Sequence, residues 1–280
     1  MQIAAAAYGQ LTPAARARVD VLLRINPDYP TWVAGVPDAD RGKVAFVRAS
    51  TWADEIKDKP AYIDEKPIDW ATAGQNLGYA DLRKHKYWHF KDLPFSPDGT
   101  KTDPADPVNL ATQIVVFADA LAAPGTSPDI ASYDLVWLIH LVGDAHQPLH
   151  AVGRFTATIS GDQGGNSETV TNAKGETLPL HFYWDGIFGG YSTVYGALKD
   201  LKDNPLPAPD SKEAAIADPD AWISNSFELA RLNAYAPPVG PEKGPYELTR
   251  AYETNTRIVS RAQAALAAIR LANLINKALQ

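Results

Sequence analysis

Apolar residues recur along most of this chain at intervals of three and four positions, which is the spacing of a helix with one buried face. This pattern predicts helices over residues 11–25, 41–57, 107–123, 127–147, 219–235 and 246–279. In the first helix, Thr12 is the expected N-cap and Pro13 the expected first helical residue. The helix over 127–147 is apolar on nearly all sides, which is typical of a buried helix.

The segments between these helices are rich in proline and glycine. Residues 93–107 and 203–219 are therefore expected to form surface loops. Residues 161–180 differ, because Thr and Val alternate with polar residues around "NAKG", and this pattern predicts a short β-hairpin. The whole pattern predicts one mainly α-helical domain over residues 1–280, with a small β excursion just before residue 181.

Composition and charge narrow the class of protein. A chain of 280 residues with 45% hydrophobic residues lies within the range of a single globular domain. Without a long run of uncharged apolar residues, we expect no membrane-spanning segment and no membrane partner. The net charge of −7 argues against a broad basic surface that tracks phosphates, although bound metal cations could supply local positive charge. The chain has no cysteine, so disulfides and thiolate metal sites are excluded.

Histidine is scarce, and three of the six histidines lie in "HLVGDAHQPLH", residues 140–150. His140 and Asp144 are four positions apart on a predicted helix, so their side chains share one face. His181 and Asp185, in "HFYWD", repeat this spacing. A proline precedes His150 by two positions and is expected to bend the helix there.

Two interpretations of these pairs remain open. A single histidine and aspartate at this spacing usually form an ordinary hydrogen-bonded or ion pair. Zinc, however, binds histidine nitrogen and aspartate oxygen, and two such pairs with further histidines could supply more than one site. His85 lies in the basic stretch "RKHK", and His146 falls two residues off the face of His140 and Asp144. We therefore interpret both as structural.

The motifs "STWADEIK", "YWHFKD", "HLVGDAHQPLH", "GGN" and "HFYWDG" occur in the order found in a known family of enzymes. The chain resembles the trinuclear-zinc, single-strand-specific nucleases and 3′-nucleotidases, which share their fold with zinc-dependent phospholipases C. The resemblance covers nearly the whole chain, and the combination of "GD-x-HQPLH" with "H-x-x-x-WD" is highly specific. It implies a mainly α, single-domain helical fold of the phospholipase C/nuclease type.

The resemblance also implies the ligands of the zinc ions. The ligands of one zinc would be Asp54, His89, His140 and Asp144, and those of a second would be His150, His181 and Asp185. Asp144 would also bridge to a third zinc.

The same resemblance implies catalytic roles for Asp54, Lys57 and Asp144. Lys57 stands where many fungal enzymes have an arginine that helps to stabilise developing phosphate charge. A lysine supplies a point charge but lacks the two-pronged donor geometry of arginine.

Substrate binding is implied at three further residues. Phe90 matches a residue that stacks on the nucleobase, and Asp92 matches a carboxylate that hydrogen-bonds the base edge. Such contacts require an unpaired base, which is the physical basis of a preference for single strands. Core packing is the alternative role for Phe90. Asn166 follows two glycines in a loop expected to line the substrate cleft, since glycine allows close backbone approach.

The N-terminal segment departs from the family pattern. Family members begin with a Trp and a nearby His, in "W-x-x-x-G-H", and these two residues hold the third zinc. Here "MQIAAAAY" matches the family just after that His, so two of the three zinc sites are expected to be retained. We expect a start site assigned too late, which would also remove an export signal. A natural two-metal relative is the alternative. The family implies a periplasmic or secreted protein, although no signal peptide is visible in this sequence.

The expected function is zinc-dependent hydrolysis of single-stranded DNA and RNA to 5′-phosphate products, together with 3′-nucleotidase activity. Nothing in the sequence requires more than a monomer. One alternative is a phospholipase C-like phosphodiesterase with the same metals, but Phe90 and Asp92 favour a nucleotide over a lipid. The other alternative is a non-catalytic zinc-binding helical protein, if the N-terminal ligands are truly absent.

Overall fold

The computed structural model describes residues 1–191 and 193–280 and is mainly helical, with 54% helix and 7% strand. This confirms the predicted fold class. Its helices are α1 (Gln2–Gly9), α2 (Pro13–Leu23), α3 (Tyr29–Trp32), α4 (Arg41–Glu55), α5 (Leu110–Ala122), α6 (Pro128–Asp144), α7 (Leu180–Asp185), α8 (Val194–Asp203), α9 (Ser211–Ala214), α10 (Pro219–Leu229) and α11 (Arg250–Ala278). Short 3₁₀ turns include η2 (Ile56–Asp58), η4 (Lys86–His89) and η5 (Pro148–Ala151), and η6 (Ala230–Ala234) is a π-helical turn.

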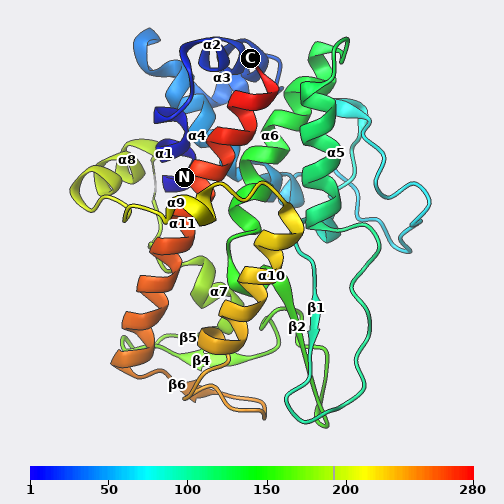
Figure 1. Ribbon diagram of the computed structural model, residues 1–280, viewed down its shortest axis with the longest axis vertical. Helices are drawn as coiled ribbons and strands as arrows, with labels where there is room; N and C mark the ends of the chain where they lie inside the picture. The colour runs from blue at the N-terminus through cyan, green and yellow to red at the C-terminus, as the bar shows by residue number, and fades with distance from the viewer. Residues whose placement is uncertain (192) are drawn as a thin grey trace.

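The strands form two small sheets at one end of the helical body (Figure 1). One sheet has the order β1 (Leu93–Phe95), β2 (Val152–Thr156) and β3 (Ile159–Ser160). The other has the order β5 (Thr177–Pro179), β4 (Thr169–Thr171) and β6 (Tyr246–Glu247). The antiparallel pairing of β4 with β5 confirms the predicted hairpin, and β6 extends it in parallel.

The predicted helices are present, with shifted ends. Thr12 caps α2 by accepting a hydrogen bond from the Ala15 backbone N–H, and Pro13 is the first helical residue, as predicted. The helix expected over 127–147 ends at Asp144, three residues early. Gln147 adopts an extended backbone, because a residue before a proline is sterically disfavoured in the helical region. Pro148 then begins η5.

The structure also contains elements that the sequence-based expectation did not include. The alanine-rich start has no alternation of apolar and polar residues, yet it forms α1 and buries Ala4, Ala5 and Ala7 against α4 and α11. Residues 93–107 were expected to be loop, but their first three residues form β1 and pair in parallel with β2. Residues 203–219 are mostly loop, as expected, apart from the single turn of α9.

Buried side chains form two hydrophobic clusters. The larger lies between α4, α5 and α6, where Trp52 is ringed edge-on by four aromatic side chains, among them Trp137. Most of α6 is buried, which confirms the expectation for this helix. The smaller cluster joins α7 to η5 and η6 through residues such as Leu149 and Trp184. The sequence segments that carry the histidines therefore run along the boundary between two packed regions.

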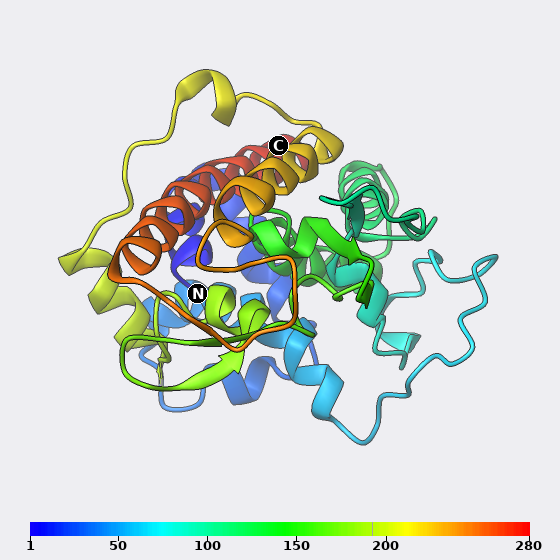
Figure 2. The same ribbon diagram turned by 90° about the horizontal axis from the view of Figure 1, so that it is seen from below.

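Helix α11 runs along the helical body and is long and apolar enough to cross a membrane, by length and composition alone (Figures 1 and 2). Half of its apolar window is buried inside the protein, and it packs against α1, α5 and α6. Its apolar face therefore belongs to the protein core.

Candidate metal centre

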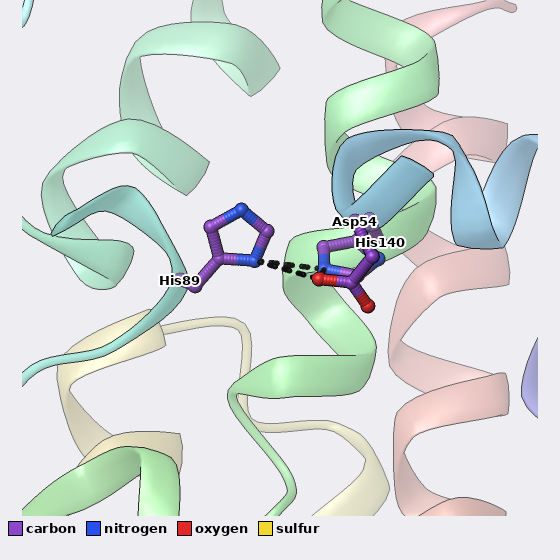
Figure 3. Close-up of side chains that lie close together, drawn as sticks. All are labelled: Asp54, His89 and His140. Carbon is purple, nitrogen blue, oxygen red and sulfur yellow. Dashed lines mark hydrogen bonds and ion pairs between the residues drawn. The ribbon is translucent and has the colours of Figure 1, made fainter. Parts of the chain in front are cut away.

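Four side chains from three separate elements converge at the centre of the molecule. Asp54 lies in the last turn of α4, His89 ends η4, and His140 and Asp144 lie one turn apart at the end of α6. Figure 3 shows His89 facing His140 and Asp54 from the opposite side of the group. The fold thus brings together residues that are up to 90 positions apart in the chain.

The distances within this first group match a set of metal ligands. The His89 Nδ1, His140 Nε2 and Asp144 Oδ2 atoms lie 2.9–3.1 Å from one another. Asp54 Oδ1 lies 3.7 Å from His89 Nδ1 and 3.8 Å from His140 Nε2. A tetrahedron with zinc–ligand bonds of 2.0–2.1 Å has edges of about 3.3–3.4 Å. The five measured separations bracket this value, so these atoms fit around one zinc ion.

A second group lies beside the first. His150 Nε2 is 3.5 Å from Asp185 Oδ1, and His181 Nε2 is 3.5 Å from Asp185 Oδ2. One ligand atom from each of the three residues lies within 4.8 Å of the others. Asp144 Oδ2 belongs to the first group, and its Oδ1 lies 3.7 Å from His150 Nδ1, the ring nitrogen that donates to the His89 carbonyl.

Backbone carbonyls fix the orientation of three histidine rings. His140 Nδ1 donates to the Ser50 carbonyl at 2.7 Å, His150 Nδ1 to the His89 carbonyl at 2.7 Å, and His181 Nδ1 to the Gly164 carbonyl at 2.8 Å. A carbonyl only accepts, so the proton of each neutral ring is on Nδ1. In the neutral form of each ring, the Nε2 lone pair therefore points into a group, as metal-binding histidines require.

His89 directs its Nδ1 atom, rather than Nε2, toward the other ligand atoms of the first group. Its Nδ1 faces the group, whereas its Nε2 is buried without a hydrogen-bond partner among the described residues. Burial lowers the pKa of His89 to about 4, and the nearby Lys57 acts in the same direction. The ring is therefore neutral at physiological pH, the form in which histidine binds a metal.

The carboxylates are charged despite their surroundings. Burial alone would raise the pKa of Asp144, but the charges of His140 and His150 lower it well below its usual value. Burial likewise opposes ionisation of Asp54 and Asp185, and neighbouring histidines lower the pKa of both. Burial would lower the pKa of His150, but Asp144 and then Asp185 raise it to about 9. In the metal-free protein, the negative charge of these aspartates therefore favours the protonated form of His150. A bound cation would displace that proton.

Both groups open onto one cavity of about 550 Å³. Its lining includes Asp54, Lys57, Asp144 and Asp185, and also residues 1–4 at the start of the chain. The loop after α7 supplies part of the opposite wall through residues 187–189. The cavity therefore joins the two groups in a single space that a substrate could enter.

The three residues expected to bind substrate lie elsewhere. None of Phe90, Asp92 and Asn166 belongs to the lining of this cavity within the described part of the chain. Phe90 is half-buried and packs on the larger hydrophobic cluster. Asn166 is exposed, and its side-chain amide donates to the Gln163 carbonyl at 2.8 Å. The roles of these residues in binding remain predictions.

Gly164, in the loop before Asn166, allows a close backbone approach to Leu149. Gly164 has a φ of +61°, and a Cβ atom there would lie 2.3 Å from the Leu149 carbonyl oxygen. Its own carbonyl accepts the His181 hydrogen bond. The loop that was expected to line the cleft therefore packs behind His181 and orients it.

Lys57 lies where the sequence placed it, one turn beyond Asp54. Its Nζ is 2.7 Å from Asp54 Oδ1, and it lines the cavity. The ammonium group therefore brings one positive charge to an otherwise acidic wall.

The remaining two histidines are structural, as interpreted from the sequence. His85 is fully buried, stacks on Trp88 at 3.4 Å between ring centres, and hydrogen-bonds Asp81 and Tyr87. His146 donates from Nδ1 to the Val142 carbonyl, and its Nε2 accepts from Arg270. Both ring nitrogens of each histidine already have partners.

One residue at the centre was missed by the sequence reasoning. Gln147 lines the cavity and donates to Asp185 Oδ1 at 2.8 Å. Its only signal in the sequence is its position inside "HLVGDAHQPLH", between two expected ligands.

Comparison with known proteins places this geometry in context. A sequence model described as S1/P1 Nuclease matches residues 1–280. The chain is 28% identical over 264 residues to "Endonuclease 3" of Arabidopsis thaliana, covering 86% of this chain and 79% of that protein. It is 36% identical over 91 residues to "Endonuclease 4" of the same plant, covering 31% of this chain and 26% of that protein.

Proposed function

Because the chain belongs to the S1/P1 nuclease family, we propose that it hydrolyses phosphodiester bonds in single-stranded DNA and RNA and removes phosphate from 3′-nucleotides. The products of strand cleavage would carry 5′-phosphates. The observation that carries this proposal is the pair of histidine–aspartate groups that share one cavity.

The two groups are the proposed zinc sites. One zinc would be held by Asp54, His89, His140 and Asp144, and the other by His150, His181 and Asp185. Bound zinc would supply Lewis-acid polarisation of the phosphate and activation of water. The matching ligand separations and the carbonyl-anchored imidazoles support this assignment.

The chain's own groups orient and neutralise the substrate. Lys57 lies beside Asp54 and provides a positive charge for a phosphate oxygen in the cavity. Asp144 stands at the end of the packed helix α6, which holds its carboxylate beside His89 and His140. No side-chain nucleophile is required in this scheme.

Recognition of an unpaired base is proposed for Phe90 and Asp92. Burial, and next the charge of Asp162, raise the pKa of Asp92 to about 7. A partly protonated carboxyl group at neutral pH can donate as well as accept a hydrogen bond, which suits the edge of a nucleobase. Base pairing would occupy that edge, so this contact favours single strands.

The test is a direct assay of the purified protein with added zinc. We expect cleavage of labelled single-stranded DNA and RNA and release of phosphate from 3′-AMP, with double-stranded DNA cleaved much more slowly. Asp54→Asn should lower the rate by at least about 10–100-fold, the loss typical of disturbing even an indirect metal contact. Asp58→Asn is the matched control, because Asp58 is exposed and lies outside the cavity lining.

The alternatives give different results in the same assay. Release of phosphocholine from phosphatidylcholine, with nucleic acids left intact, would replace the proposal with a phospholipase C-like activity. Tight zinc binding without hydrolysis of any of these substrates would indicate a non-catalytic zinc-binding protein.

A further inference from the structure

Gln147 occupies the short segment between the two candidate metal groups. Its backbone N–H donates to the Asp144 carbonyl at 3.0 Å, and its carbonyl accepts from the His150 N–H at 3.0 Å. Asp144 belongs to the first group, and His150 belongs to the second. The backbone of Gln147 is therefore hydrogen-bonded to one residue of each group.

The side chain of Gln147 makes two further contacts. Its Oε1 accepts from the Leu149 N–H at 2.5 Å, which closes the turn into η5. With the oxygen engaged there, the amide NH₂ faces Asp185 and donates to its Oδ1 at 2.8 Å. One residue thus connects Asp144, His150 and Asp185, which come from two distant parts of the chain.

Asp185 depends on this contact. It is the last residue of the six-residue helix α7, and its side chain is 42% exposed. Its nearest imidazole nitrogens, on His150 and His181, are both 3.5 Å away. The Gln147 amide makes the shortest polar contact to this carboxylate among the described residues, so it is the main restraint on the carboxylate's rotation.

We propose that Gln147 is a positioning residue for the second metal group, which holds the Asp185 carboxylate in the orientation that binds zinc. This inference rests on the proposed function only in assuming that His150, His181 and Asp185 bind zinc. The Gln147 amide nitrogen acts through Asp185 Oδ1, while the amide oxygen of the same side chain accepts from the Leu149 N–H.

The experiment measures zinc affinity by competition with a chromogenic chelator. Wild-type protein should show two classes of zinc site. Gln147→Met removes the donor while keeping the length of the side chain, and it should weaken one class by roughly 10–100-fold, as indirect partners of metal ligands typically do. The other class should stay within about twofold and so reports an intact fold. Gln75→Met is the matched control, because Gln75 is exposed and lies outside the cavity lining.

A second variant separates positioning from turn closure. In Gln147→Asn, the shorter amide oxygen can still accept from the Leu149 N–H, as asparagine does in tight turns, but the amide cannot reach Asp185. We expect the same loss of zinc affinity as in Gln147→Met. Wild-type affinity in Gln147→Asn would show that only the turn matters and would overturn the proposal.

A double-mutant cycle with Asp185→Ala shows whether the two residues act together. If Gln147 works through Asp185, adding Gln147→Met to Asp185→Ala should change zinc affinity by less than about twofold. Additive losses would contradict the proposal, as would a loss at both classes of site in Gln147→Met alone.

These outcomes are independent of nuclease activity. A wild-type protein that binds two zinc ions but cleaves no nucleic acid would refute the proposed function, while the variants still decide the role of Gln147. A wild-type protein that binds no zinc would refute both.

Discussion

At the scale of single residues, hydrogen bonds decide which nitrogen each histidine offers. The carbonyls of Ser50, His89 and Gly164 each accept a hydrogen bond from an Nδ1–H group, which directs Nε2 of that ring toward the candidate metal centre. Spacing in the sequence could place the histidines on a common face, but it could not identify these carbonyls. They depend on backbone positions contributed by other elements.

Asp92 gives a prediction about pH. Its folded pKa of about 7 lies above the ordinary value of 3.8, chiefly because the carboxyl group is buried. The folded state therefore binds this proton more tightly, and the resulting stability is present at pH 4 and lost as the pH rises through 7. Asp92→Asn should raise the free energy of unfolding at pH 8 by up to about 4 kcal/mol and change it little at pH 4.

Urea denaturation of the zinc-free protein at the two pH values measures this difference. Asp103→Asn serves as the control, because Asp103 is exposed in the same loop region. An equal effect of Asp92→Asn at pH 4 and pH 8 would show that the buried carboxyl does not cause the pH dependence.

At the scale of elements, the loop over residues 161–168 acts as a rigid support. Arg154 forms a buried ion pair with Glu168 at 2.9 Å and also contacts Asp162, whose backbone N–H donates to the Arg154 carbonyl. Tyr235 donates to Asp162 at 2.6 Å, and the Arg154 guanidinium lies over the Tyr235 ring. Buried charges that are paired in this way fix the loop behind His181.

Gly164→Ala tests this support. A Cβ atom would meet the Leu149 carbonyl oxygen at 2.3 Å, and the positive φ of +61° is itself unfavourable for alanine. We expect a loss of about 1–3 kcal/mol in the free energy of unfolding. We also expect weaker zinc binding at the second group, because the displaced carbonyl would no longer orient the His181 ring.

Gly175→Ala is the matched control for this prediction. Gly175 has a φ of +78°, but a Cβ atom there would meet nothing within 4 Å. It should share the conformational cost and leave zinc affinity unchanged. Equal zinc affinities in the two alanine variants would show that the loop does not orient His181.

The elements themselves were largely predictable where the apolar spacing was long and regular, as in α6 and α11. The α1 helix was missed because its alanines give no periodic contrast between apolar and polar positions. The three-residue strand β1 was missed because its pairing with β2 depends on contacts nearly 60 residues away. Such short strands are set by tertiary context rather than by local sequence.

At the scale of the whole molecule, the candidate centre exists only in the folded chain. Its seven expected ligands come from residues 54 to 185 and from α4, η4, α6, η5 and α7. The family motifs predicted these seven residues, and the fold brings them together in two neighbouring groups. Gln147 and the supporting loop were not found, because their contacts become visible only when the two packed regions meet.

Zinc should therefore stabilise the whole fold. A ligand that binds only the native state at 100 times its dissociation constant adds about 2.7 kcal/mol to the free energy of unfolding. We expect the melting temperature to rise with zinc concentration and to fall after treatment with EDTA, as measured by scanning calorimetry. His140→Ala should reduce the rise, and a melting temperature that does not change with zinc would contradict the assignment of both groups.

The hydrogen bond between Arg270 and His146 keeps one imidazole of the central motif from binding a metal. The stretch "HLVGDAHQPLH" contains three histidines, and His146 lines the same cavity as His140 and His150. Arg270, which lies 124 residues further along in α11, donates to His146 Nε2 at 2.8 Å and so occupies its free lone pair. Burial, followed by the arginine charge, lowers the pKa of His146 to about 3. The C-terminal helix thereby keeps the His146 ring neutral and leaves neither of its nitrogens free to bind a metal.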